Sequence, residues 1–319
     1  MPDFRANARQ DYTVQSLIDH FKDQPLDFEP GERYQYDNSG YFLLGAIIEK
    51  ASGMTYEAFL KKRIFNVVGM PRTSLESTSR ITPRRAHGYS KADKTWLNAD
   101  WISMTQPYAA GGIVSTVDDL ARWDAILYTD RLLRSETLQQ AFAPHRLKDG
   151  RSIDYGYGWQ TGRWEDFTVL QHGGGIDGFA SMGVRIPEKK VYVAILSNRA
   201  AEPSPSSVAQ RLATHLAGEP WEPKPVAVPA AALDGYMGVY RGPDDDTWTV
   251  AVEGGKLYTQ PSGGRKLEAI PLSESEFFVE GSVGRLRFER DDVGKVTALV
   301  RHSFGGLPRR LVRAAEGPK

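Results

Sequence analysis

Residues 30–53 read PGERYQYDNSGYFLLGAIIEKASG, and this stretch decides the fold assignment. Its second half places apolar side chains at spacings of three and four, which predicts a helix over residues 41–52 with one face toward a core. The members of that face are Leu43, Leu44, Ile47, Ile48 and Ala51. Asn38 or Ser39 can cap the start of the helix, and Gly53 fits the left-handed position just past its end.

Tyr36 and Asn38 stand two residues apart directly before this helix. If the chain is extended there, both side chains leave the same face. A phenol can then relay a proton, while a carboxamide can both donate and accept hydrogen bonds to one substrate. The structural alternative is that Asn38 caps the helix and Tyr36 is a packed aromatic. Both interpretations stay open at this point.

A second segment of interest, LQHGGGIDGF, covers residues 170–179. His172 follows an apolar strand predicted over residues 167–171, and three glycines come next. Glycines let a substrate approach the backbone closely, and their N–H groups can bind a developing oxyanion. The alternative is an edge strand with a bulge and a locally bonded histidine. The run GGGIDG also matches a dinucleotide fingerprint formally, but strand-like alternation follows it instead of a helix, which argues against a nucleotide site.

The composition of the 319 residues excludes several classes of protein. Forty Lys and Arg balance forty Asp and Glu, so the basic surplus of a nucleic-acid binder is missing and no nucleic-acid partner is expected. Without cysteine there is no disulfide framework and no thiolate nucleophile. The six histidines lack metal-ligand spacing, so we predict no metal site and no cofactor. The sequence contains no run of about 18 apolar residues, so no membrane span is expected.

The chain divides into two compositional regimes. Over residues 1–218 helical patterns alternate with short apolar strands, among them residues 191–196 (VYVAIL), which we expect to be buried on both faces. Residues 219–229 hold four prolines and predict a stiff linker. Over residues 230–319 the apolar period changes to two and glycine pairs supply turns, which predicts a small antiparallel barrel of about eight strands.

Together the segments resemble the serine β-lactamase/penicillin-binding-protein superfamily, in the class C-like branch with family VIII esterases, D-aminopeptidases and DD-peptidases. The matching segments are Tyr36-Asp37-Asn38, NVVGMPRT (66–73), AGGIVSTVDDLARW (110–123), His172-Gly173-Gly174 and VYVAILSNR (191–199). The resemblance implies an α+β fold, with a β-lactamase/transpeptidase-like antiparallel sheet flanked by helices. The C-terminal part resembles the lipocalin-like barrels appended to several members.

The resemblance also implies catalytic roles for Tyr36, Asn38, His172 and Gly175, and substrate-binding roles for Gly173 and Gly174. Tyr36 would relay protons and Asn38 would hold the substrate's amide or the family's lysine. His172 would orient the substrate's polar end, and the Gly175 N–H would form half of the oxyanion hole. A histidine at this place, where β-lactamases carry lysine, favours esters or small peptides over β-lactams.

The family's first motif, Ser-x-x-Lys, supplies the nucleophile and its base. No serine in this chain is followed by lysine three residues later, so no nucleophile is assigned. We therefore expect that the chain begins at an internal methionine or is an N-terminally truncated form, with a first domain that is incomplete at its N-terminus. Such a domain should be loose, aggregation-prone or completed by an oligomer or by another chain.

Two hypotheses of function follow. The first is a serine hydrolase by descent that acts on small esters, amides or D-amino-acid peptides through an acyl-enzyme, inactive as this chain because the nucleophile is absent. The second is a non-catalytic pseudoenzyme or regulatory protein that uses the pocket or the barrel to bind a ligand. The sequence leaves the localisation of the protein open.

Overall fold

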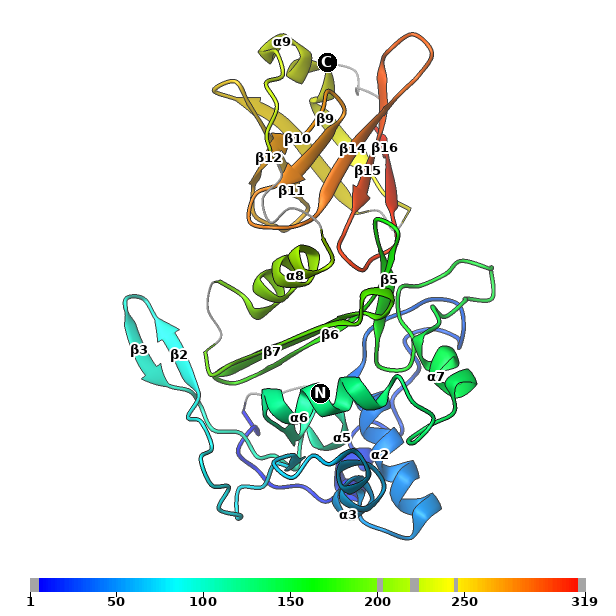
Figure 1. The fold of residues 1–319 in the computed structure, drawn as a ribbon, viewed down its shortest axis with the longest axis vertical. Coiled ribbons are helices and arrows are strands. Elements are labelled where there is room, and N and C mark those ends of the chain that lie inside the picture. The colour runs from blue at the N-terminus through cyan, green and yellow to red at the C-terminus, as the bar shows by residue number, and fades with distance from the viewer. Residues whose placement is uncertain (1–5, 200–202, 219–223, 244–245, 315–319) are drawn as a thin grey trace. The chain divides into compact units, whose positions relative to one another are not determined.

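The computed structural model describes residues 6–199, 203–218, 224–243 and 246–314. These form two compact units (Figure 1). One unit takes residues 1–159, 171–185 and 192–209, and the other takes residues 160–170, 186–191 and 210–319. Part of the proline-rich segment lies outside the described residues, so the predicted domain boundaries at 218 and 230 stay predictions.

Short helices make up much of the first unit. Their bounds are α1 Val14–Asp19, α2 Asn38–Ser52, α3 Tyr56–Leu60, the π-helical η1 Lys61–Phe65, α4 Asn66–Val68, α5 Tyr108–Gly111, α6 Val117–Ile126 and α7 Ser135–Phe142. Helix α8, Pro205–Leu216, follows later in the chain. One core joins buried side chains of the earlier elements: Leu17, Phe42, Tyr56, Leu60, Phe65, Met70 and Tyr108. No helix in the described residues is long and apolar enough to cross a membrane.

Helix α2 starts at Asn38, three residues before the predicted start, and its cap is Asp37. The Asp37 carboxylate accepts hydrogen bonds from the backbone N–H of Ser39 at 2.9 Å and of Gly40 at 2.8 Å. The prediction that Asn38 or Ser39 caps the helix was therefore wrong, because the carboxylate one residue earlier accepts the free amides. Gly53 ends the helix with φ 68°, as predicted.

The buried face of α2 also differs from the predicted one. Phe42 and Gly45 are buried, whereas Leu44 is 49% exposed and Ile47 is 58% exposed. A Cβ atom at Gly45 would lie 2.5 Å from the Tyr108 ring. The missing side chain thus lets α2 approach α5 closely, and this contact selects the side of the helix that faces the core.

A four-stranded sheet has the order β5-β6-β7-β8. Its strands are β5 Gln160–Trp164, β6 Phe167–Ile176, β7 Phe179–Ile186 and β8 Val191–Ser197. Two small two-stranded sheets pair β1 Ser74–Leu75 with β4 Ile113–Val114, and β2 Tyr89–Ala92 with β3 Thr95–Asn98. The β2–β3 hairpin extends away from the helices of its unit (Figure 1). Strand β6 is longer than predicted, since it continues through His172 and the three glycines.

Strand β8 is not buried on both faces, contrary to the prediction from its apolar run. Val193 is buried, but Leu196 is 44% exposed. The strand order explains the difference, because β8 is the last strand of the sheet in the described residues. An apolar run alone does not distinguish such a terminal strand from a central one.

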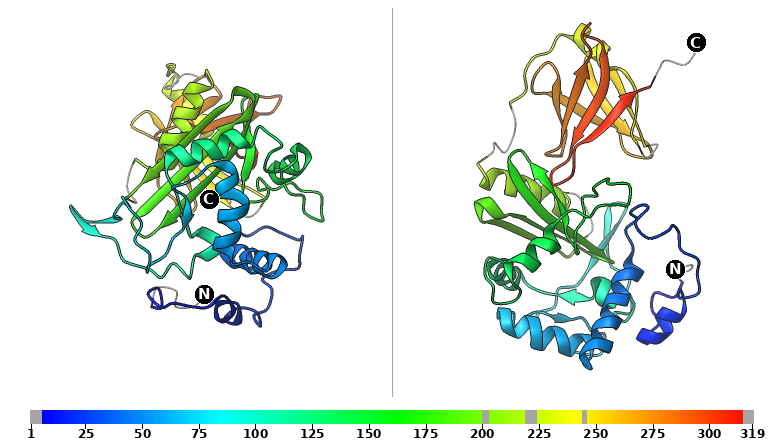
Figure 2. Two further views of the ribbon diagram at one scale, coloured as in Figure 1. Left: turned by 60° about the horizontal axis from the view of Figure 1, so that its bottom comes forward. Right: turned by 90° about the vertical axis from the view of Figure 1, so that its right-hand side faces the viewer.

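The second unit contains a closed eight-stranded antiparallel barrel, which confirms the predicted class (Figure 2). Its strands are β9 Gly238–Arg241, β10 Thr247–Glu253, β11 Lys256–Pro261, β12 Leu267–Pro271, β13 Glu276–Val279, β14 Arg285–Arg290, β15 Val296–His302 and β16 Arg309–Arg313. The short α-helix α9 Ala230–Leu233 and the 3-10 helix η3 Asp234–Tyr236 precede them. Alternate residues fill the barrel core, as the period of two predicts, with Leu286 fully buried and Phe288 3% exposed.

Candidate active site

Tyr36 and Asn38, at the start of α2, differ in whether they line a cavity. Tyr36 is 52% exposed and lines a cavity of about 680 Å³. Asn38 is the first residue of the helix and is exposed, but it is not among the residues that line this cavity. Since Asp37 provides the cap, Asn38 does not cap the helix. Tyr36 contacts other aromatic rings but remains half exposed.

His172 is held at both ring nitrogens. Its Nε2 lies 2.8 Å from the hydroxyl of Tyr155, and its Nδ1 lies 2.6 Å from the carbonyl oxygen of Gly173. The Tyr36 ring centre is 6.2 Å from that of His172 and 6.1 Å from that of Tyr155. The structure therefore brings Tyr36 and His172 together, with Tyr155 joining them.

The three glycines after His172 are exposed and lie within strand β6. A Cβ atom at Gly174 would lie 2.6 Å from the Ser181 hydroxyl oxygen, whereas one at Gly175 would meet nothing within 4 Å. Gly175 thus borders open space, and an incoming group could approach its backbone. Gly173 lies beside Met182 and contributes the carbonyl that holds His172.

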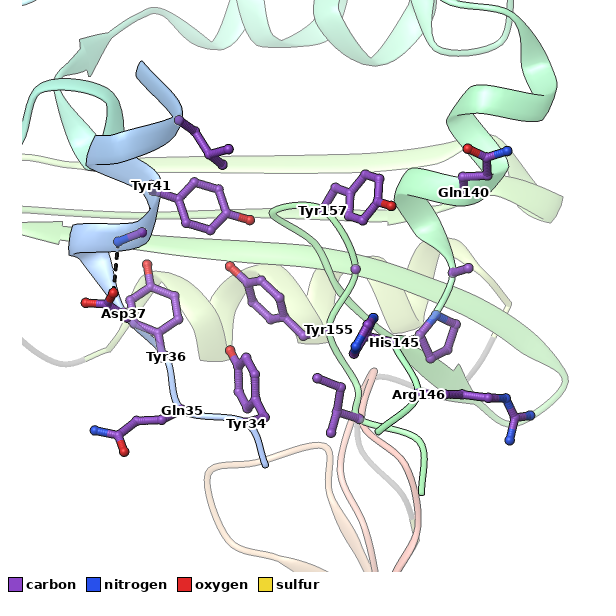
Figure 3. Close-up of a pocket in the computed structure, with 16 residues that line it drawn as sticks. Tyr34, Gln35, Tyr36, Asp37, Tyr41, Gln140, His145, Arg146, Tyr155 and Tyr157 are labelled. Carbon is purple, nitrogen blue, oxygen red and sulfur yellow. Dashed lines mark hydrogen bonds between the residues drawn. The ribbon is translucent and has the colours of Figure 1, made fainter. Parts of the chain in front are cut away.

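The cavity is rich in phenol groups. Its lining includes Tyr34, Tyr36, Tyr41, Tyr155 and Tyr157. Figure 3 shows the hydroxyls of Tyr36, Tyr41 and Tyr155 directed toward the same region. The cavity is built from the segment before α2, the first turns of α2 and the loop after α7.

Burial keeps several of these phenols protonated. Desolvation raises the pKa of Tyr155, and the neighbouring Tyr41, Tyr36 and Tyr34 raise it further. Desolvation also raises the pKa values of Tyr34 and Tyr41. The cavity therefore presents neutral O–H groups at physiological pH, which can donate and accept hydrogen bonds without carrying charge.

The sequence patterns did not predict a place in the site for Tyr34, Tyr41, Tyr155 and Tyr157. A signal was present, because the run YGYGW over residues 155–159 repeats an aromatic at every second position. That run reaches the cavity only through the tertiary fold, which a linear pattern does not reveal. In the described part of the chain, no three His, Asp or Glu side chains are grouped so as to hold a metal ion.

A family model described as Beta-lactamase matches residues 1–218. The chain belongs to the beta-lactamase family. A second model, described as a domain of unknown function (DUF3471), matches residues 222–310 of this beta-lactamase-family chain. These matches and the observed architecture confirm the predicted family and fold class.

Several known proteins are similar to this beta-lactamase-family chain. Penicillin-binding protein 4* of Bacillus subtilis (strain 168) is 32% identical over 289 residues, which is 83% of the chain and 64% of that protein. The D-aminopeptidase of Gluconobacter oxydans (strain 621H) is 27% identical over 214 residues, 66% of the chain and 39% of that protein. The octameric penicillin-binding protein homologue from Pyrococcus abyssi has a TM-score of 0.58 and 25% identity, covering 94% of this chain and 70% of that one. The chain spans less than two thirds of the length of either curated relative.

Proposed function

We propose that the tyrosine-lined cavity is the substrate-binding part of an acyl-transfer site for small amides, esters or D-amino-acid peptides. The observation that carries this proposal is the meeting of two distant segments, with Tyr36 and Tyr155 beside His172 at the cavity. The family assignment supports the reaction class, and the similarity to a D-aminopeptidase supports amide or peptide substrates.

Each residue has a proposed role that follows from its chemistry. Tyr36 relays a proton to or from the reacting group, because its phenol is accessible from the cavity. The Gly175 N–H stabilises the developing oxyanion, because open space borders this residue. Asn38 holds the substrate's amide from the rim, outside the cavity lining. Gly173 and Gly174 form the strand wall along which the substrate lies.

Turnover needs a nucleophile, and the chain has no serine with lysine three residues later. We therefore expect this chain to bind substrates without hydrolysing them. A fluorophosphonate probe should label no serine, and p-nitrophenyl esters should not be hydrolysed. Labelling that maps to any serine would contradict this part of the proposal.

Binding is tested by calorimetric titration of D-phenylalanine amide. Gly175→Ala should weaken binding about tenfold, because its methyl group occupies the space needed by the substrate carbonyl and displaces a hydrogen bond from the Gly175 N–H to the carbonyl oxygen. Gly235→Ala is the matched control, since a Cβ there also meets nothing within 4 Å but the residue belongs to the second unit. Equal affinities in the two variants would refute the contact between the substrate carbonyl and the Gly175 N–H.

The second candidate function is a non-catalytic binding or regulatory protein, and the missing Ser-x-x-Lys motif favours it. The genomic sequence upstream of Met1 distinguishes the two candidate functions. An in-frame Ser-x-x-Lys in the preceding coding sequence supports the hydrolase. A stop codon or unrelated sequence supports the binding protein.

We also propose that the chain works with further copies of itself or with a second chain. The similarity to an octameric homologue supports this idea. The β2–β3 hairpin is a candidate contact, because Trp96 is 43% exposed and Leu97 is 53% exposed on it. Light scattering after size exclusion should give a mass above that of one chain, and Trp96→Ser with Leu97→Ser should lower it. A monomer in the unaltered protein would overturn the proposal of self-association.

A further inference from the structure

The hydrogen bonds of His172 determine where its proton lies. A carbonyl oxygen can only accept, so the 2.6 Å contact between Nδ1 and the Gly173 oxygen requires a proton on Nδ1. In the neutral imidazole the other nitrogen then has a lone pair and accepts. The 2.8 Å contact of Nε2 is therefore a hydrogen bond donated by the Tyr155 hydroxyl.

This direction determines what the Tyr155 hydroxyl can offer to a ligand. Tyr155 has one proton and donates it to His172, so toward any further partner its oxygen accepts. The hydrogen bonds thus run from Tyr155 to His172 and from His172 to the Gly173 carbonyl.

The hydrogen-bonding capacity that remains at the Tyr155 hydroxyl is that of an acceptor. The hydroxyl donates its one proton to His172, which leaves the lone pairs of its oxygen. Tyr155 lines the cavity, whereas His172 is not among the lining residues. At the Tyr155 hydroxyl, a ligand in the cavity therefore contacts a hydrogen-bond acceptor, because the Tyr155 proton is already donated to His172.

The surroundings of that lone pair also favour a cation. The rings of Tyr34 and Tyr36 lie beside Tyr155, with ring centres 5.4 and 6.1 Å away, the first tilted by 31° and the second nearly perpendicular at 83°. The π-electrons of aromatic rings attract ammonium groups. The Asp37 carboxylate is on the lining as well. The one arginine of the lining, Arg146, donates to the Gly150 carbonyl at 3.3 Å and points away from the tyrosine hydroxyls (Figure 3).

We propose that Tyr155 selects the charge of the substrate: its oriented hydroxyl accepts a hydrogen bond from a primary ammonium group and discriminates against a carboxylate in the same place. This inference rests on the proposed function for the identity of the cavity as the substrate site. His172 is then a positioning residue, which acts by holding the Tyr155 proton, and does not itself contact the substrate's polar end.

The test uses two probes that share a phenyl ring and differ in charge, 2-phenylethylammonium and 3-phenylpropionate. Titration calorimetry on the whole chain should give an affinity for the ammonium probe at least about tenfold above that for the carboxylate probe, the value of one hydrogen bond to a charged group. Equal affinities, or tighter binding of the carboxylate, would overturn the proposal.

Variants test whether Tyr155 causes the difference in affinity between the two probes. Tyr155→Phe should lower the affinity for the ammonium probe about tenfold and leave that for the carboxylate within about twofold. His172→Phe frees the Tyr155 proton to turn toward the cavity, so the difference between the affinities for the two probes should decrease. Tyr56→Phe is the control, because Tyr56 lies in the helical core outside the cavity. If Tyr155→Phe leaves both affinities unchanged, Tyr155 does not select charge.

A second measurement does not depend on binding. Imidazole nitrogen NMR shifts of His172, assigned by their loss in His172→Phe, should report a neutral ring protonated at Nδ1, and Tyr155→Phe should shift the population toward the Nε2–H form. A ring protonated at Nε2 in the unaltered protein would refute the hydrogen-bond chain. Neither probe contains an ester or amide bond that acyl transfer could cleave, so their failure would leave the acyl-transfer proposal standing. Conversely, failure of D-phenylalanine amide to respond to Gly175→Ala would leave the charge selection standing.

Discussion

At the scale of single residues, a buried ion pair carries the sharpest prediction about stability. Arg185 is 2% exposed and its Nε donates to Asp124 at 2.7 Å, which joins α6 to β7. The Tyr128 ring centre lies 4.7 Å from the same guanidinium group. Removing one partner leaves the other charge buried and uncompensated, whereas removing both does not.

We therefore expect Asp124→Ala and Arg185→Met each to lower the free energy of unfolding by about 3–5 kcal/mol. The double variant that combines Asp124→Leu with Arg185→Met should recover most of this loss. Chemical denaturation measures all three. The control is the exposed pair Arg151–Asp149, where Asp149→Ala should leave the free energy of unfolding nearly unchanged, because water screens both charges. Additive losses in the double variant would show that the two side chains do not act as a pair.

Prediction from sequence at the scale of residues reaches chemistry that is local in the chain. The motif around Tyr36 and the His172-glycine run are contiguous, so both could be recognised before the fold was known, and the roles given to them stay predictions. The hydrogen bond between Tyr155 and His172 joins residues from a loop and a strand. Only the tertiary fold brings these two side chains together, so no spacing rule could have predicted their contact.

At the scale of elements, the start of α2 depends on one carboxylate. Asp37 accepts two backbone hydrogen bonds there. Asp37→Ala should lower the free energy of unfolding by about 1 kcal/mol, while Asp37→Asn should retain nearly all of it, because asparagine caps helices equally well. Thermal melts of the two variants measure the difference. Equal losses would mean that the charge of Asp37, and not its capping bonds, stabilises the segment.

The helices and strands also show which features the apolar periodicity of the sequence predicts and which it does not. The three-four spacing predicted the existence of α2 and the alternation predicted the barrel strands, since both patterns reflect burial against a core. The orientation of α2 was wrong because Gly45, which has no side chain to count, makes the close contact with Tyr108. The burial of β8 was wrong because its place in the strand order is a property of the whole sheet.

At the scale of the whole molecule, two separate cores predict separable stability. The helical core includes Leu60, which is 5% exposed, and the barrel core includes Leu286, which is fully buried. Each leucine-to-alanine change should cost about 2–5 kcal/mol in its own core. Differential scanning calorimetry should resolve two transitions, with Leu60→Ala lowering one midpoint and Leu286→Ala the other. A single transition lowered equally by both variants would contradict two independent cores.

The cavity beside Tyr36, Tyr155 and His172 is proposed to bind an amine-bearing substrate of a beta-lactamase-family site. A crystal structure of the chain with D-phenylalanine amide would locate that substrate. We expect the ligand in this cavity, with its ammonium nitrogen within hydrogen-bonding distance of the Tyr155 hydroxyl and its carbonyl directed toward the Gly175 N–H. A ligand bound elsewhere, or bound here with its ammonium group directed away from Tyr155, would refute this proposal.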